Sequence, residues 1–171
     1  MAIALSPEHQ QILYHHAEQT YPQECCGVLV GQFLPALPGG DGGDSLRVKQ
    51  VITVFPTENQ WNAEIAQALG DVAGMPERDA TPEHNFSIAP EDLFRIQKTA
   101  RDRHLIIVGF YHSHPNAPAR PSAFDQAIAW SDYSYLILSV QQGKTAELTS
   151  WVLDERGEFK QEVIHPGTIN N

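Results

Sequence analysis

The chain has 171 residues, a length that fits one domain, and 42% of them are hydrophobic, which is enough for a buried core. Acidic residues outnumber basic ones by 21 to 11, and the net charge of -10 argues against nucleic acid or an anionic membrane surface as the partner, because both need basic patches. The N-terminus has no pattern of a secretory signal, and the longest apolar run is too short to span a bilayer, so a cytoplasmic protein is expected.

The first predicted element is a helix over residues 7–20. Ser6 is suited to cap its N-terminus, Pro7 fits the first turn, and Glu8 lies near the positive end of the helix dipole. Pro22 follows shortly after and ends the helix.

Two strands are predicted next. Residues 26–33 form the first, and their continuous apolar centre indicates burial on both faces. Residues 46–55 form the second, which is expected to be antiparallel to the first. Between them, residues 35–44 are rich in glycine and proline and are interpreted as a flexible loop.

Residues 57–83 are harder to assign. They contain six acidic residues and one basic residue, Arg78, and are interpreted as an acidic insertion that lies over the surface. A short helix is predicted inside it at residues 63–73. A short strand is expected directly afterwards, at residues 85–88.

The remaining predicted elements are an amphipathic helix, a central apolar strand, a second helix, a hairpin that turns through Gln142-Gly143, and a last short strand. In order they occupy residues 90–103, 105–112, 122–131, 133–140 with 146–153, and 159–164. Strands and helices mix without strict alternation, which favours an α+β class with a mixed sheet and helices packed on it.

The central strand ends in two histidines, His112 and His114. Residues i and i+2 of an extended chain point to the same side, and their Cα atoms lie ~6.5–7 Å apart, so both imidazoles can reach one ion. Pro115 ends the strand, and two further prolines stiffen the loop that follows. Such stiffness keeps metal ligands in place before the metal arrives.

Asp125 lies in the first turn of the helix that Ser122 begins, where the helix dipole favours an ionised carboxylate. Two imidazoles and one carboxylate make a three-ligand site with a position open for water, which is the pattern of a catalytic zinc site. Taken singly, the S-x-x-D spacing is a variant of a capping box, and an H-x-H pair is common on strands; the combination is more specific. The same donor set also suits Fe(II).

Hydrolysis at such a site also needs a group that moves protons. Glu24 is the candidate, because it lies at the mouth of a buried strand and Gly27 lets backbones approach closely. Taken alone, Glu24 would be an ordinary solvated glutamate. The adjacent Cys25 and Cys26 are interpreted as small strand residues.

The stretches PQECCGVLVG and GFYHSHPNAPARPSAFD resemble the JAMM (MPN+) metalloproteases. That family has an upstream glutamate, an E-x-C-G-x-L-x-G strand, H-x-H-P, and an aspartate in P-S-x-x-D, with ten residues between the second histidine and the aspartate. The resemblance covers residues 21–140 and is nearest to the short prokaryotic members. It implies a single MPN-like domain over residues 1–171, with a curved mixed β-sheet and helices packed in α-β-α layers.

The resemblance also implies a role for each matching residue. His112, His114 and Asp125 would bind Zn2+, and no other cofactor is implied. Glu24 would take a proton from the attacking water and give it to the leaving amine. The Ser122 hydroxyl would face the metal and hydrogen-bond the oxyanion, while the backbone capped the helix.

The implied function is a zinc-dependent peptidase that hydrolyses an amide or isopeptide bond at the C-terminal tail of a ubiquitin-like or sulfur-carrier protein, or releases an amino acid such as cysteine from it. The alternatives are a non-cleaving MPN scaffold that binds such a protein, and a mononuclear iron enzyme. Scaffold members usually lose metal ligands, and this chain keeps them all. The other six histidines fit no ligand spacing and are interpreted as surface or packing residues, and Trp61 is interpreted as either core or substrate contact.

Overall fold

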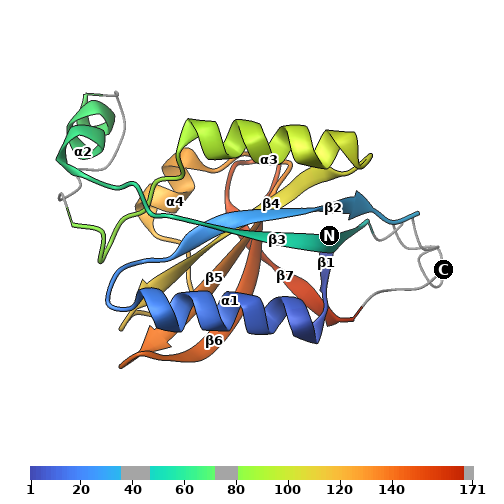
Figure 1. Cartoon of the computed structure of the whole chain (residues 1–171). Helices are drawn as coiled ribbons and strands as arrows, with labels where there is room; N and C mark the ends of the chain where they lie inside the picture. The colour runs from blue at the N-terminus through green and yellow to red at the C-terminus, as the bar shows by residue number, and fades with distance from the viewer. Residues whose placement is uncertain (36–46, 72–80, 168–171) are drawn as a thin grey trace.

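The structure, a computed structural model, describes residues 1–35, 47–71 and 81–167 (Figure 1). The helices are α1 (Pro7–Thr20), α2 (Ala63–Gly70), α3 (Pro90–Asp102) and α4 (Ala123–Ile128). The strands are β1 (Ala2–Leu5), β2 (Cys26–Phe33), β3 (Val48–Thr57), β4 (Ile106–Pro115), β5 (Ser134–Gln141), β6 (Lys144–Leu153) and β7 (Phe159–Pro166). Within the described ranges, no helix has the length and apolar character needed to cross a membrane.

The strands form a mixed sheet in the order β1-β3-β2-β4-β5-β6-β7, and β7 pairs with β1 so that the sheet closes into a barrel. β4 lies in the centre, antiparallel to β2 and parallel to β5. The mixed sheet and the helices packed on it are confirmed. The expected α-β-α layers need correction, because β1 is parallel to both β3 and β7 and joins the two ends of the sheet.

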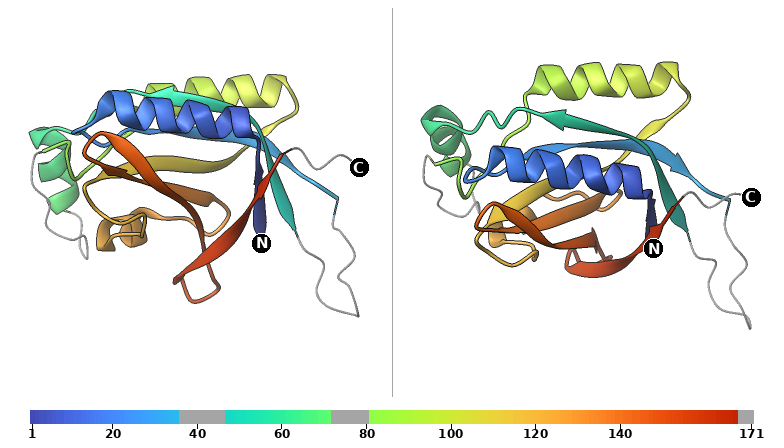
Figure 2. Two further views of the ribbon diagram at one scale, coloured as in Figure 1. Left: turned by 90° about the horizontal axis from the view of Figure 1, so that it is seen from below. Right: turned by 60° about the horizontal axis from the view of Figure 1, so that its bottom comes forward.

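Helices α1 and α3 cover opposite faces of the strands around β2, as Figures 1 and 2 show. On the side that α1 covers, Leu13 of α1 packs in a core that includes Leu29. On the side that α3 covers, Ile96 of α3 packs against Val28 and Val30. Alternate residues of β2 therefore face two different cores, which confirms the expected burial on both faces.

Several local predictions are confirmed. Helix α1 begins after Ser6, whose Oγ accepts a hydrogen bond from the His9 backbone N–H at 3.2 Å. β2 and β3 are antiparallel, as expected. The β5–β6 hairpin turns through Gln142 and Gly143, whose φ angles of 50° and 80° suit a primed turn.

Several predictions differ from the structure. Strand β1 was not expected, because four apolar residues carry too weak a pattern and their partners β3 and β7 are remote in sequence. Residues 85–88 form no strand, because Ser87 bonds to the Asn59 side chain and the Gln60 backbone instead of a ladder. Some boundaries also differ: α2 and α4 end at Gly70 and Ile128, three residues before their expected ends, and β4 continues to Pro115, three residues beyond its expected end. Residues 36–44 of the expected loop and residues 72–80 of the expected insertion lie outside the described residues.

Gly31 in β2 is a position where the structure leaves no room for a side chain. A Cβ there would collide with the backbone carbonyl oxygen of Gln50 in β3. The ladder holds that oxygen, so we expect Gly31→Ala to lower the free energy of unfolding by about 1–3 kcal/mol, measured by chemical denaturation. The control is Gly70→Ala at the end of α2, where nothing lies within 4 Å of the new Cβ and the change should stay within about 0.5 kcal/mol. Equal stability of Gly31→Ala and the native protein would contradict the close approach.

Candidate metal centre

The two histidines of the predicted site lie at the end of β4, on the same side of the strand, as their i, i+2 spacing predicts. β4 is held on both sides, because His112 pairs with Cys26 of β2 and with Ile137 of β5. After Pro115 the chain leaves the strand, and Asn116 takes a positive φ of 53°. A well-anchored strand end therefore presents both imidazoles toward α4.

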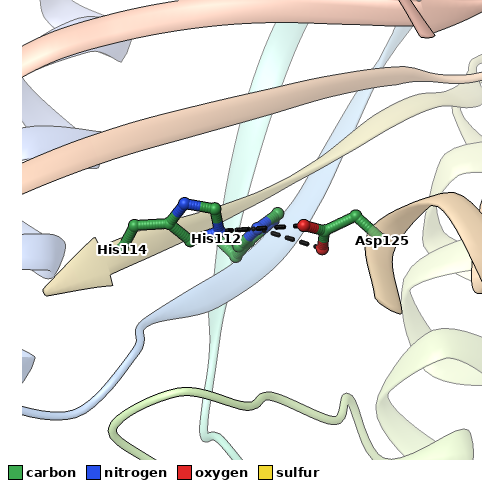
Figure 3. Close-up of side chains that lie close together, drawn as sticks. All are labelled: His112, His114 and Asp125. Atoms are coloured by element: carbon green, nitrogen blue, oxygen red, sulfur yellow. Dashed lines mark hydrogen bonds and ion pairs between the residues drawn. The ribbon is translucent and has the colours of Figure 1, made fainter. Parts of the chain in front are cut away.

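Asp125 in the first turn of α4 faces these imidazoles, and the three side chains point toward one another (Figure 3). The His112 and His114 Nε2 atoms lie 2.9 Å apart. The Asp125 carboxylate oxygens lie 3.2 Å from the Nε2 of His112 and 3.7 Å from that of His114. Ligand atoms around a tetrahedral zinc ion, each bonded at ~2.0–2.1 Å, lie about 3.3 Å apart. The three distances lie on either side of that value, with Oδ1 of Asp125 nearer His112 and Oδ2 nearer His114, so the three side chains are close enough to share one ion.

The hydrogen bonds of His114 fix which ring nitrogen carries its proton. Its Nδ1 lies 2.9 Å from the carbonyl oxygen of Pro118, and a carbonyl oxygen only accepts hydrogen bonds. The Nδ1 atom of His114 is therefore protonated, and in the neutral ring the Nε2 lone pair faces the centre of the site. This arrangement is typical of metal-ligating histidines, whose second nitrogen donates to an outer partner.

His112 is held by packing as well as by the strand. It is 2% exposed, and its ring stacks on Phe86 with centroids 4.5 Å apart and planes 20° from parallel. Two Nε2 lone pairs 2.9 Å apart repel each other unless a proton or a cation lies with them. The donor set of two imidazoles and one carboxylate fits Zn2+, and it also fits Fe(II).

Asp125 is oriented by a reciprocal cap at the start of α4. The Ser122 backbone N–H donates to Asp125 Oδ2 at 2.6 Å, and the Asp125 backbone N–H donates to Ser122 Oγ at 3.2 Å. Burial alone would raise the pKa of the Asp125 carboxyl. A positive charge at His112 and hydrogen bonds donated by His112, His114 and Ser122 oppose burial and hold the pKa of the Asp125 carboxyl well below its ordinary value. A cation between two neutral imidazoles would lower this pKa in the same direction. The carboxylate is thus ionised, as a metal ligand must be.

One expectation about Ser122 needs correction. The sequence suggested that the backbone could cap the helix while the hydroxyl faced the metal. In the structure the hydroxyl itself accepts the cap hydrogen bond. A hydroxyl group can accept one bond and donate another, so the proton of Ser122 is still available to a second partner.

Glu24 lies beside the predicted ligands and is 5% exposed. Its backbone N–H donates to the carbonyl of Pro82 at 2.8 Å, and its own carbonyl accepts from Asn59 Nδ2 at 3.0 Å. A cavity of about 190 Å³ lies at this place, and its walls bring together residues that are far apart in sequence. They include Glu24, His84, Phe86, His114, Ser122 and Asp125.

From the sequence, no role at the site was assigned to His84 or Phe86, which also line this cavity. His84 was interpreted as a surface or packing residue. Phe86 begins the stretch FSIAPEDL, which is in keeping with the family resemblance, but it was given no role, because neither spacing nor periodicity places residues 81–88 near the histidines. Trp61, which the sequence left open as a core residue or a substrate contact, is a core residue. It is buried and packs edge-to-face on Phe124 of α4, with ring centroids 5.5 Å apart. It thereby ties the segment after β3 to the helix that carries Asp125.

Both cysteines are buried and lie in β2 or directly before it. Burial raises the pKa of Cys25 to about 12 and that of Cys26 to about 11, so both thiols are neutral. Cys25 packs in the core on the side that α1 covers, and Cys26 Sγ lies 3.4 Å from Thr57 Oγ1. These contacts agree with the interpretation of both as small strand residues.

Comparisons with known proteins identify relatives of this chain. Residues 6–154 match the family described as prokaryotic homologs of the JAB domain. The desampylase of Haloferax volcanii is 37% identical over 81 residues, which cover 47% of this chain and 57% of that protein. The match thus spans little more than half the length of this curated relative.

Two solution structures resemble the whole fold. A protein from Desulfitobacterium hafniense is 28% identical, with a TM-score of 0.67 over 96% of this chain and 92% of that one. A protein from Salinibacter ruber is 27% identical, with a TM-score of 0.60 over 98% of this chain and 92% of that one. The similarity to both extends over nearly the entire chain.

Proposed function

This chain belongs to the prokaryotic homologs of the JAB domain, and from that premise we propose that it is a zinc-dependent peptidase. Its substrate would be an amide or isopeptide bond at the C-terminal tail of a ubiquitin-like or sulfur-carrier protein. The observation that carries the proposal is the convergence of His112, His114 and Asp125 beside a cavity that Glu24 also lines. The name of the related desampylase, which describes removal of a small protein modifier, supports the same class of substrate.

We assign the metal to His112, His114 and Asp125, whose donor atoms all lie within 4.8 Å of one another. When bound, zinc would polarise a carbonyl oxygen and lower the pKa of water. The protein holds its three ligands by separate means: the β4 ladder and Phe86 for His112, the Pro118 carbonyl for His114, and the helix cap for Asp125. This support from several directions keeps the site in one geometry before the metal binds.

Glu24 is proposed to move the proton of the reaction. As a general base it would accept a proton from water, and as a general acid it would return that proton to the nitrogen of the leaving amine. Its place in the cavity wall supports this role, as does its backbone, which is hydrogen-bonded on both sides of the Cα atom.

Ser122 is proposed to donate its hydroxyl proton to the oxyanion that forms at the carbonyl carbon. Its Oγ already accepts from the Asp125 N–H, which fixes the oxygen and leaves the proton for another partner. The residue lines the same cavity as Glu24 and Asp125.

Ser122→Ala tests this role, and α1 offers a matched control. Both Ser122 and Ser6 cap a helix by accepting from the backbone N–H three residues on, each at 3.2 Å. Each alanine variant should therefore lose about 1 kcal/mol of unfolding free energy. We expect only Ser122→Ala to lose turnover as well, by about 10²–10³-fold in kcat, because it alone removes a donor to the oxyanion. Wild-type turnover in the folded Ser122→Ala variant would rule out the donor role.

The proposed function is tested with ubiquitin-like carrier proteins encoded in the same genome, each extended by a peptide at its C-terminal tail or joined to a target lysine. The purified protein is incubated with each conjugate, and mass spectrometry follows loss of mass at the tail. We expect cleavage of at least one carrier, its abolition by a chelator and its recovery with added zinc. Cleavage that resists complete removal of the metal would contradict the proposed mechanism, and no cleavage of any carrier would contradict the proposed substrate.

A further inference from the structure

Asn59, three residues before α2 and directly after the exposed Glu58, makes an unusual set of contacts for a loop side chain. Its Nδ2 donates to the carbonyl oxygens of Glu24 at 3.0 Å and Asn85 at 2.8 Å. Its Oδ1 accepts from the backbone N–H groups of Trp61 at 3.0 Å and Ser87 at 3.1 Å. A side-chain amide has two donor hydrogens and two acceptor lone pairs, so these four bonds use its full capacity.

These bonds matter because Glu24 lies outside the regular part of the sheet. Strand β2 begins at Cys26, so the strand ladder does not fix the Glu24 backbone directly. Its N–H is bonded to Pro82, and its carbonyl is bonded to Asn59. On the C-terminal side, the neighbouring Cys25 is bonded to Ser113 of β4. On the side away from the sheet, the Glu24 backbone is held by the segment at 82–87, and the Asn59 side chain ties this segment to it.

The same side chain reaches the metal ligands indirectly. Phe86, which stacks on the His112 ring, lies between Asn85 and Ser87, and both of these neighbours are bonded to Asn59. On its other side, Asn59 holds the backbone of Trp61, whose ring packs on Phe124, the residue before Asp125. One amide therefore connects the surroundings of the base with the surroundings of two ligands.

We propose that Asn59 is a positioning residue that sets the place of the Glu24 carboxylate relative to the metal ligands. The inference rests on the proposed peptidase function. Its physical reason is that catalytic groups must be held within about 0.5 Å of the productive geometry, and a displacement of about 1 Å costs ~10²-fold in rate. A carboxylate on a chain segment outside the ladder needs such support from elsewhere.

Asn59→Asp separates the hydrogen bonds that Asn59 donates from those that it accepts. Aspartate is nearly the same size and keeps the acceptor for Trp61 and Ser87, so the loop stays anchored, but it loses both donations. We expect kcat on the carrier conjugate that the native protein cleaves to fall about 10- to 100-fold. KM should change by less than about twofold, and zinc per chain should stay the same, because substrate binding and the ligands are intact.

The matched control is Asn62→Asp in the same loop. Asn62 caps α2 by accepting from the N–H groups of Glu64 and Ile65, and aspartate is an equally good cap. Its side chain donates to the carbonyl of Gln60, so these hydrogen bonds stay within the loop and the helix. This variant should keep the kcat of the native protein. An equal loss of kcat in Asn62→Asp and Asn59→Asp would assign the effect to the loop as a whole and overturn the inference.

A double-variant comparison distinguishes positioning from general damage. If Asn59 acts through Glu24, then in a Glu24→Gln background Asn59→Asp should lower the residual single-turnover rate by less than about twofold. The same fold-loss in both backgrounds, counted per folded and zinc-loaded molecule, would overturn the inference.

Hydrogen exchange gives a readout that needs no activity. Peptides that cover residues 22–26 and 82–87 should exchange faster in Asn59→Asp than in the native protein, and at the native rate in Asn62→Asp. Unchanged exchange in Asn59→Asp would contradict the inference even if the rate fell. If the native protein cleaves no carrier, the proposed function fails, while the exchange result still decides whether Asn59 holds the Glu24 segment.

Discussion

His114→Ala is expected to lose the bound metal and, with it, all cleavage above background. The substitution leaves His112 and Asp125 as the remaining ligands, and a catalytic zinc site needs three from the protein. Loss of a supporting partner alone typically weakens metal binding by about 10- to 100-fold, so loss of a ligand should weaken it by more than about 100-fold. The measurement is the metal content per chain after gel filtration, together with cleavage of the carrier conjugate.

The fold should survive this change, which makes the result interpretable. The His114 side chain is 11% exposed at the end of β4, and its bond to the Pro118 carbonyl is worth about 1 kcal/mol. His15→Ala serves as the control, because His15 is an exposed histidine on α1, on the other side of the central strands from α3. Its metal content and activity should equal those of the native protein. A His114→Ala protein that keeps a full complement of tightly bound metal would contradict the assignment of His114 as a metal ligand.

Glu24→Gln is expected to keep the metal and to lose turnover by about 10²–10⁴-fold, the usual contribution of a positioned acid or base. Glutamine has the same length as glutamate, so packing at this nearly buried position should persist. Its amide is not a proton acceptor at neutral pH, and the step that needs a base therefore slows. Turnover, metal content and the thermal midpoint are measured on the same preparation.

The control for this variant is Glu58→Gln, which removes one negative charge from an exposed side chain in the neighbouring loop. It should cleave at the native rate. Native-like cleavage by Glu24→Gln would mean that another group moves the proton. The comparison also tests the scaffold alternative: a non-cleaving binding protein would show no turnover in the native protein and the same carrier affinity in both variants.

The identity of the metal separates zinc hydrolysis from iron chemistry. Two imidazoles and a carboxylate fit either ion, so the donor set alone leaves both open. We expect zinc in the purified protein and restoration of chelated protein by zinc. Restoration by iron(II) under anaerobic conditions, with zinc inactive, would favour the iron enzyme.

The site was predictable from the sequence to the extent that short-range rules govern it. The i, i+2 spacing of His112 and His114 requires a shared side of a strand, and the Ser122 to Asp125 spacing requires a helix cap. Both rules act over a few residues and are confirmed. Glu24 was a candidate from its place at the mouth of a buried strand, but no local rule places it beside residues as remote in sequence as His112, and the family resemblance supplied its role.

The remaining wall of the cavity could not be predicted in the same way. His84 and Phe86 lie in a segment without regular structure, and its position is set by the Asn59 side chain and by the backbone of Glu24. Irregular segments follow no hydrophobic period, so a local pattern is missing. This also explains why a strand was wrongly predicted at residues 85–88. Residues that bond to side chains and loop backbone can resemble a strand in sequence without pairing with a neighbouring strand.

The sequence by itself determined the helices, most strands, the pairing of β2 with β3, and the identity of the three candidate metal ligands. Each of these depends on periodicity, capping or turn chemistry between near neighbours. Only the tertiary structure decided that β1 closes the sheet between β3 and β7, and that the segment after β3 folds back to hold Glu24. Those contacts join residues that are remote in sequence; β1 and β7, for example, lie near opposite ends of the chain. Their free energy comes from packing and hydrogen bonds that exist only after the sheet has assembled.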